Sequence, residues 1–352
     1  MPPMGVPWGS VLTRYYLPNS NHAREDAIHQ SDSNAPFDRR SIPASARETK
    51  WQAGDGHAIR RIEWTAPPAA GKPRGHILFM AGRGDAYEKY LESFEHWRLQ
   101  GWQVSAADWR GQAGSGRLGV GDAGHIDDFA TWISDLAALW ADWASGREGP
   151  LVLIGHSMGG HLVLRAALEQ VLAPRPAALV LSAPMLDIFP EHLPLFIKRR
   201  VADAMVKLGN PGRAAWKISE KPGSRASARQ SLLTHDDTRY ADEQFWREAR
   251  PELRLGPGSW GWIAAATRST ALLFRPGLLE SLDLPVLIVA TSNDKLVSPA
   301  AIRRALDRLP CAEALIFGAE ARHEVLREVD AVRDRALAAI DEFLARKAAT
   351  KQ

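Results

Sequence analysis

A serine in a glycine-rich turn is the first feature of this sequence that could do chemistry. The turn reads Gly155-His-Ser-Met-Gly159, fits the pattern G-x-S-x-G, and lies between an apolar run at 151–154 and a predicted helix at 161–170. Such a turn strains the backbone at the serine and leaves no room for side chains at its two glycines. It would raise the Ser157 hydroxyl above a sheet and direct the N–H of Met158 toward the same space, at a helix start that favours negative charge. This context favours a serine nucleophile over an ordinary glycine-rich turn.

A histidine and an aspartate lie where a serine nucleophile would need them. A serine hydroxyl requires a base, and a histidine base requires an acid that fixes its tautomer and stabilises its cation. Asp294 comes directly after a predicted strand at 285–290, and His323 lies in the loop after a predicted strand at 313–317. A turn aspartate and a solvated loop histidine are the alternatives, and Asp187 is the reserve candidate for the acid.

Other titratable residues near the turn are predicted to have structural roles. His156 and His161 adjoin the nucleophile in sequence, but we expect them to point away from the hydroxyl and to pack. A second cluster contains residue types that bind metals, and it consists of Asp122, His125, Asp127 and Asp128. Two of these carboxylates suit the start of a helix better, because the helix dipole favours acidic residues there. The sequence therefore predicts neither a metal nor a cofactor.

Alternating strands and helices would position these residues. Hydrophobic periodicity predicts a hairpin around Gly54-Asp-Gly56, followed by buried strands at 76–80, 103–107, 151–154, 177–181, 285–290 and 313–317. Helices are predicted at 88–100, 126–143, 161–170 and 329–345. The alternation indicates the α/β class, with a mostly parallel central sheet flanked by helices on both faces.

The alternation also predicts the domain organisation. It stops between 187 and 272, where helical pieces predict a cap inserted into the sheet domain. The core would then comprise 46–186 and 273–352. Residues 1–45 are rich in turn-forming residues and are predicted to be an irregular N-terminal extension.

Composition bounds the class of protein. The chain has 352 residues, of which 45% are hydrophobic, enough for a large core with an insertion. A net charge of +3, scattered basic residues and no nucleic-acid motif argue against a nucleic-acid partner. The single cysteine, Cys311, excludes an internal disulfide, and the sequence shows neither a membrane-spanning apolar run nor a signal-peptide pattern. We therefore expect a cytoplasmic protein, of unspecified oligomeric state.

Several motifs resemble those of the monoacylglycerol lipase and lysophospholipase branch of the α/β-hydrolases, and the last two resemble its bacterial lysophospholipases more closely. They are Gly155-His-Ser-Met-Gly-Gly160, Ser182-Ala-Pro-Met-Leu186, Ser292-Asn-Asp-Lys-Leu-Val297, Arg322-His-Glu-Val-Leu326, Gly82-Arg-Gly-Asp85 with Lys89-Tyr90, and Gly261-Trp262. The resemblance implies an α/β-hydrolase fold and a triad of Ser157, Asp294 and His323, in the chain order of that fold. It also implies oxyanion donors at the backbone N–H groups of Arg83 and Met158. Many relatives have His-Gly where this chain has Ala81-Gly82, which changes the surroundings of the Arg83 donor.

The resemblance implies ester hydrolysis through an acyl-enzyme, as in a lysophospholipase or monoacylglycerol lipase. A carboxylesterase, thioesterase or peptidase with a non-lipid substrate is the alternative, and a catalytically silent binding protein is a third hypothesis. The partner would be a small ester or a single-chain lipid, with Gly82 and Trp262 as candidate substrate-binding residues.

The predicted cap carries the residues that could bind a lipid. Its apolar side chains suit an acyl chain, although most of them could instead pack the cap onto the sheet: Ile197, Val201, Met205, Leu208, Trp216, Phe245, Trp246, Trp260 and Trp262. The basic run Lys198-Arg-Arg200 could meet a phosphate headgroup or the anionic inner face of a membrane, which would make the protein peripheral to it. A plain solvated helix face is the interpretation that we favour for this run.

Overall fold

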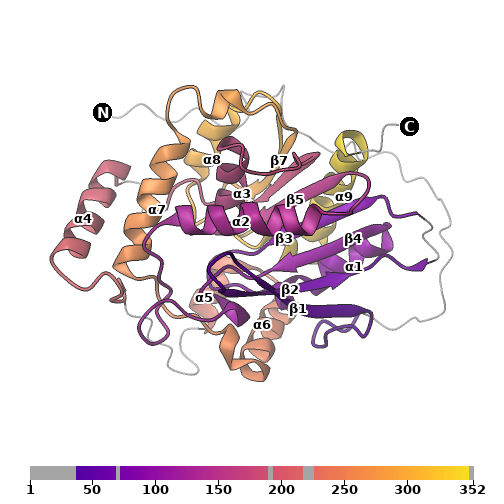
Figure 1. The fold of residues 1–352 in the computed structure, drawn as a ribbon, viewed down its shortest axis with the longest axis horizontal. Coiled ribbons are helices and arrows are strands. Elements are labelled where there is room, and N and C mark those ends of the chain that lie inside the picture. Colours follow the sequence, from indigo (N-terminus) through magenta and orange to yellow (C-terminus); the bar gives the residue numbers. More distant parts are fainter. Residues whose placement is uncertain (1–36, 69–71, 189–192, 217–225, 349–352) are drawn as a thin grey trace.

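One mixed sheet forms the centre of the molecule (Figure 1). The computed structural model describes residues 37–68, 72–188, 193–216 and 226–348. Within them, eight strands lie in the order β1-β2-β4-β3-β5-β6-β7-β8. The strands are β1 (Ala46–Gln52), β2 (Ala58–Trp64), β3 (Gly75–Met80), β4 (Trp102–Ala107), β5 (Leu151–His156), β6 (Ala178–Ser182), β7 (Val286–Thr291) and β8 (Ala312–Phe317). In this sheet β2 runs in the opposite direction to the other strands, which are parallel to one another, so the predicted hairpin and the mostly parallel sheet are confirmed.

Helices cover both faces of the sheet because its buried strands are apolar on both sides. In β5, Leu151 and Leu153 point into one core with α2 (Phe129–Ala144) and α3 (Met158–Leu168). Val152 and Ile154 point into the opposite core, with α1 (Leu91–Leu99) and α9 (Asp330–Lys347). Side chains alternate along a strand, so an uninterrupted apolar run requires cover on both faces. The predicted α/β fold class is confirmed.

Two helix starts differ from the sequence prediction for local reasons. The predicted helix at 88–100 begins as a 3₁₀ turn, η3 (Tyr87–Tyr90), before α1. The predicted helix at 126–143 begins only at Phe129, because the carboxylate of Asp128 accepts a hydrogen bond from the N–H of Ala130 and caps it.

The segment between β6 and β7 is helical in its described part. It contains α4 (Leu195–Lys207), α5 (Ala226–Leu233), α6 (Asp237–Ala249), η5 (Pro251–Leu253) and α7 (Trp260–Leu273). Figure 1 shows α4 packed along α7 at one end of the molecule, with α5 and α6 together at a distance from them. The division of the chain into a core and a cap remains a prediction. No helix in the described ranges is long and apolar enough to cross a membrane.

The end of the predicted N-terminal extension packs against α6. The indole N–H of Trp246 donates to the carbonyl of Arg39 at 2.9 Å, and the guanidinium groups of Arg39 and Arg40 each lie 2.6 Å from the carboxylate of Asp242. We call residues 37–45 the N-terminal strap. The rest of the predicted extension, residues 1–36, lies outside the described residues.

Candidate active site

The turn between β5 and α3 places Ser157 in a strained conformation. Its φ of 54° and ψ of −117° lie in a backbone region that residues with a side chain rarely adopt. The flanking glycines allow this turn to pack. A Cβ at Gly155 would lie 2.7 Å from the carbonyl carbon of Gly159, and a Cβ at Gly159 would lie 2.3 Å from the carbonyl oxygen of Met80. The chain can therefore hold the serine in this turn only while both glycines are present.

The loops after β7 and β8 bring Asp294 and His323 together. Nδ1 of His323 lies 2.7 Å from Oδ2 of Asp294, and both residues are only 4% exposed. The second carboxylate oxygen accepts from the backbone N–H groups of Leu296 at 2.8 Å and Val297 at 3.1 Å. An ionised carboxylate can only accept hydrogen bonds, so Nδ1 carries the proton and Nε2 of His323 is left as a base.

The electrostatics of this pair favour its charged forms. Burial alone would raise the pKa of Asp294, but the charge and hydrogen bond of His323 outweigh it and hold that pKa below its ordinary value. Burial alone would lower the pKa of His323, but the carboxylate of Asp294 raises it, with further contributions from Glu324 and Asp85. The imidazolium that forms when the histidine takes a proton is therefore stabilised.

The loop after β3, residues 81–86, runs beside the serine, and we call it the oxyanion loop after the role that the sequence predicts for the N–H of Arg83. A Cβ at Gly82 would lie 3.1 Å from the Cβ of Ser157, so a larger residue here would force the loop or the serine to shift slightly. The indole of Trp109 donates to the carbonyl of Ala81 at 2.8 Å, and the N–H of Gly84 donates to Oε1 of Gln112 at 2.7 Å. Both anchors come from the glycine-rich loop after β4. Sequence reasoning did not predict them, although the glycines of that loop indicated a tight path.

The side chain of Arg83 leaves the oxyanion loop toward α7. Its Nη2 donates to the carbonyl of Gly256 at 2.7 Å, and its guanidinium carbon lies 5.1 Å from the ring of Trp262 and 5.4 Å from that of Trp216. Burial lowers the pKa of Arg83 to about 10. Trp262 is buried and lies 6.0 Å from the ring of Phe129, so it supports the arginine from the core side.

Comparison with known proteins places the chain in a family. The family described as serine aminopeptidase, S33, matches residues 71–330. The chain belongs to this family. Lysophospholipase L2 of Escherichia coli K12 is 28% identical over 290 residues, which cover 77% of this chain and 80% of that protein. Probable lysophospholipase L2 of Haemophilus influenzae is 24% identical over 269 residues, covering 76% of this chain and 83% of that protein.

Solved structures agree on the fold. A soluble variant of monoglyceride lipase from Saccharomyces cerevisiae superposes with a TM-score of 0.70 and 19% identity, covering 90% of this chain and 100% of that one. A monoacylglycerol lipase of Paleococcus ferrophilus superposes with a TM-score of 0.61 and 21% identity, covering 82% and 99%. The predicted resemblance to the α/β-hydrolases, and to their lysophospholipase and monoacylglycerol lipase group, is confirmed. As a serine aminopeptidase family member, the chain is a serine hydrolase.

The reserve acid of this hydrolase, Asp187, has another partner. Its Oδ1 lies 3.1 Å from Nζ of Lys198, which also donates to the carbonyl of Ile188. Lys198 is 7% exposed, whereas Arg199 and Arg200 are exposed. The prediction that Lys198 shares one solvated basic face with the two arginines is therefore wrong. A buried carboxylate holds this lysine inward, and the sequence could not show that pairing.

The two histidines beside the serine are buried. His156 packs between Tyr90 and His323, with ring centroids 5.9 Å and 4.9 Å away, so it lies closer to the candidate base than expected. Burial, and then the charge of His323, lower the pKa of His156 to about 4, so it stays neutral at ordinary pH. His161 packs edge-on against Phe129, and its Nε2 lies 2.6 Å from Oγ of Ser269.

The residues of the cluster of metal-binding types around His125 make hydrogen bonds within the protein. Nδ1 of His125 lies 2.7 Å from Oγ of Ser259, and its Nε2 lies 3.2 Å from the carboxylate of Asp127. Asp128 caps α2. In the described part of the chain, no group of three or more histidines, cysteines and carboxylates could hold a metal ion.

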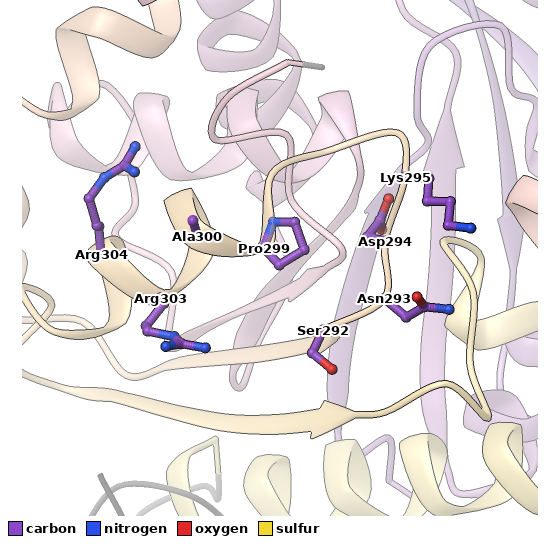
Figure 2. Close-up of a pocket in the computed structure, with 8 residues that line it drawn as sticks. All are labelled: Ser292, Asn293, Asp294, Lys295, Pro299, Ala300, Arg303 and Arg304. Atoms are coloured by element: carbon purple, nitrogen blue, oxygen red, sulfur yellow. The ribbon is translucent and has the colours of Figure 1, made fainter. Parts of the chain in front are cut away.

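A surface pocket of about 460 Å³ opens beside the loop that carries Asp294 (Figure 2). Its lining is Ser292, Asn293, Asp294, Lys295, Pro299, Ala300, Arg303 and Arg304. Figure 2 shows Lys295 and Arg304 at opposite ends of it. Neither Ser157 nor His323 lines this pocket, and Asp294 is the one member of the candidate triad that does.

Proposed function

We propose that this chain hydrolyses carboxylic esters through an acyl-enzyme on Ser157, with His323 as base and Asp294 as the acid that orients it. The observation that carries the proposal is the 2.7 Å bond between the buried side chains of His323 and Asp294. It fixes the tautomer that leaves Nε2 free to take a proton from a serine. The strained turn at Ser157 and the family membership support the same assignment.

The proposed reaction has two steps. Oγ of Ser157 attacks the ester carbonyl carbon while Nε2 of His323 takes the hydroxyl proton, and the backbone N–H groups of Arg83 and Met158 hold the oxyanion. Met158 is the first residue of α3, so its N–H has no partner within the helix and lies at the positive end of the dipole. Collapse expels the alcohol with the proton of His323. Water then attacks the acyl carbon, His323 takes its proton, and the serine and a carboxylic acid are released.

We propose a single-chain lipid, a lysophospholipid or a monoacylglycerol, as the substrate. The relatives and solved structures whose names include lysophospholipase and monoglyceride lipase support this choice. Arg83, in the loop beside the serine, offers a cation to a headgroup, and the buried ring of Trp262 supports its guanidinium. The family description favours aminopeptidase activity as the second candidate.

We also propose that α4 touches the lipid surface from which the substrate comes. Its outer face, continued by the C-cap residue Leu208, exposes large apolar side chains, with Ile197 at 38%, Val201 at 51% and Leu208 at 87% exposure. The cations Arg200 and Lys207 are exposed beside them. An apolar stripe flanked by cations suits the boundary between headgroups and acyl chains of an anionic membrane.

Replacing the serine tests the proposed function. Ser157→Ala should abolish ester hydrolysis, with a loss on the order of 10⁶ in turnover, because the other groups of a triad cannot replace the nucleophile. Covalent labelling by a fluorophosphonate should vanish with it. The purified protein would be incubated with lysophosphatidylcholine, monoacylglycerol, a short aryl ester and amino-acid anilides of matched concentration.

The substrate panel separates the candidates. Preference for the two lipids supports the lipid hydrolase, and preference for the anilides supports the aminopeptidase. A thermal melt should show that Ser157→Ala remains folded. Persistent labelling of that variant at another serine would overturn the assignment of the nucleophile.

A further inference from the structure

Lys89 lies at the centre of a buried charged cluster that the proposed reaction does not use. Its ammonium nitrogen lies 2.6 Å from Oε1 of Glu324, 2.8 Å from Oδ1 of Asp85 and 3.1 Å from Oε2 of Glu243. The side chains of all four residues are at most 6% exposed. Removing so many charges from water is costly. Pairing with Lys89 offsets part of that cost, and pairing of the carboxylates of Glu243 and Glu324 with Arg229, Arg247 and Arg327 offsets more of it.

The three carboxylates come from three separate parts of the molecule. Asp85 belongs to the oxyanion loop, three residues after the glycine that lies beside Ser157. Glu324 is the residue after His323, in the stretch 318–324 that we call the histidine loop. Glu243 lies on α6, between β6 and β7. One ammonium group therefore joins the loop beside the nucleophile, the loop that carries the base, and a helix outside the sheet.

Other contacts make these connections rigid. The hydroxyl of Tyr90 donates to Oδ2 of Asp85 at 2.6 Å, and the guanidinium of Arg327 pairs with the second oxygen of Glu324. The backbone N–H of Glu324 donates to the carbonyl of Leu233 at 2.8 Å. Burial alone would lower the pKa of Lys89, but its carboxylates, with Asp85 foremost, raise it, so the ammonium stays charged. The carboxylates therefore have a permanent cation between them.

We propose that Lys89 is a positioning residue that holds the oxyanion loop and the histidine loop at a fixed separation across the serine. This inference rests on the proposed function. The oxyanion donor must lie on one side of the reacting carbonyl while the base lies on the other, and Ser157 itself fixes neither. A displacement of about 1 Å between such groups costs about 10²-fold in rate. A buried ion cluster could be replaced by apolar side chains without loss of stability, so geometry is a better reason for this one than stability.

The test is Lys89→Met, assayed on a short soluble ester with every rate divided by the concentration of sites that a fluorophosphonate titrates. Titration counts only competent enzyme, so a loss of folded protein does not lower the rate per site. We expect kcat per titrated site to fall about 10²-fold while KM changes less than about threefold, because the displaced groups act on the transition state. Lys89→Arg should recover at least part of the loss, since it restores a cation to the three carboxylates.

A matched control is Arg239→Met. Arg239 is an equally buried cation of α6 that pairs with Glu92, Asp236 and Asp330, none of which belongs to the oxyanion or histidine loop. It should lose stability but keep its kcat per titrated site. If Lys89→Met does not fold, Asp85→Ala provides the same test, because it removes one connection and leaves Lys89 paired with Glu324 and Glu243.

Two results would separate failure of this inference from failure of the proposed function. A wild-type protein that neither hydrolyses esters nor reacts at Ser157 would remove the function on which the inference rests. An active wild type, with Lys89→Met or Asp85→Ala retaining kcat per titrated site within twofold, would overturn the positioning role alone. A loss confined to KM, or an equal loss in Arg239→Met, would overturn it as well.

Discussion

At the scale of single residues, the environment of His323 determines how the proposed reaction should depend on pH. The base must be neutral to take the serine proton, and the carboxylate of Asp294 raises its pKa above the ordinary value of 6.5 against the effect of burial. Because its pKa is raised, His323 becomes protonated, and so inactive as a base, at a higher pH than an ordinary histidine would when the solution is acidified. We therefore predict that kcat/KM falls tenfold per pH unit on the acid side, with a midpoint above 6.5.

This midpoint can be assigned to one histidine. His156 is the titratable ring closest to His323, and its pKa of about 4 keeps it neutral through the transition. The measurement is kcat/KM for a soluble ester across the acid and neutral range, with stability checked at each pH. A midpoint clearly below 6.5 would contradict the electrostatic description of the pair.

The residues of the candidate triad could be predicted because they follow from local signals. Glycines mark the turn at Ser157, and apolar strands directly precede Asp294 and the histidine loop. Lys198 and Lys89 could not be predicted in this way. Their burial is set by how the surrounding segments pack, and the position of a lysine in the sequence gives no sign that its side chain points inward.

At the scale of elements, α4 is the helix whose apolar face the sequence pattern located correctly but whose exposure it did not predict. Ile197, Val201 and Leu208 share a face, as the periodicity predicted, but this face is exposed and the small Ala202 is buried instead. Periodicity shows that a helix has an apolar face, and it does not show what covers that face. The strands were easier to predict, because an apolar run of five or six residues is typical of a strand buried at the centre of a sheet.

Removing the exposed apolar face of α4 should weaken lipid hydrolysis specifically. In a variant with Ile197→Ser, Val201→Ser and Leu208→Ser, each side chain loses about 1 kcal/mol of burial in a membrane interface. Three such losses amount to about 100-fold in affinity for the surface. We predict a raised apparent KM on anionic vesicles that contain the lipid substrate, and an unchanged rate on a short soluble ester.

A double variant provides the control for this prediction. Leu99 and Val171 are also exposed, at positions outside α4, so Leu99→Ser with Val171→Ser removes apolar surface without touching the proposed contact. It should leave both rates unchanged. An equal loss on vesicles for the two variants would argue that α4 has no special part in binding a lipid surface. Lys198 is unsuitable for such a test, because its substitution would leave Asp187 buried without its cation.

At the scale of the whole molecule, α6 joins segments that are far apart in the sequence. Glu243 of α6 pairs with Lys89 in the buried charged cluster, and Arg239 of α6 pairs with Glu92 of α1. Asp242 holds the N-terminal strap through two arginines, with more than 200 residues of chain between the partners. Sequence analysis predicted an irregular extension lying on the surface of the body, but not its partner on α6, since short turn-rich segments acquire their order from the surface on which they lie.

The contact between the strap and α6 should contribute to stability and not to catalysis. Asp242 is buried and accepts charge-assisted hydrogen bonds at 2.6 Å from both Arg39 and Arg40, whereas those arginines are partly exposed. In Asp242→Asn the arginines can return to water, so the loss should be about 1–3 kcal/mol in the free energy of unfolding. Urea unfolding measures this free energy.

The exposed Glu248, in the last turn of the same helix, provides the control. Glu248→Gln should change the free energy of unfolding by less than about 0.5 kcal/mol. Both variants should keep kcat per titrated site, because neither side chain contacts the oxyanion loop or the histidine loop. A large fall in kcat for Asp242→Asn with no change in stability would show that the strap acts on the active site through α6.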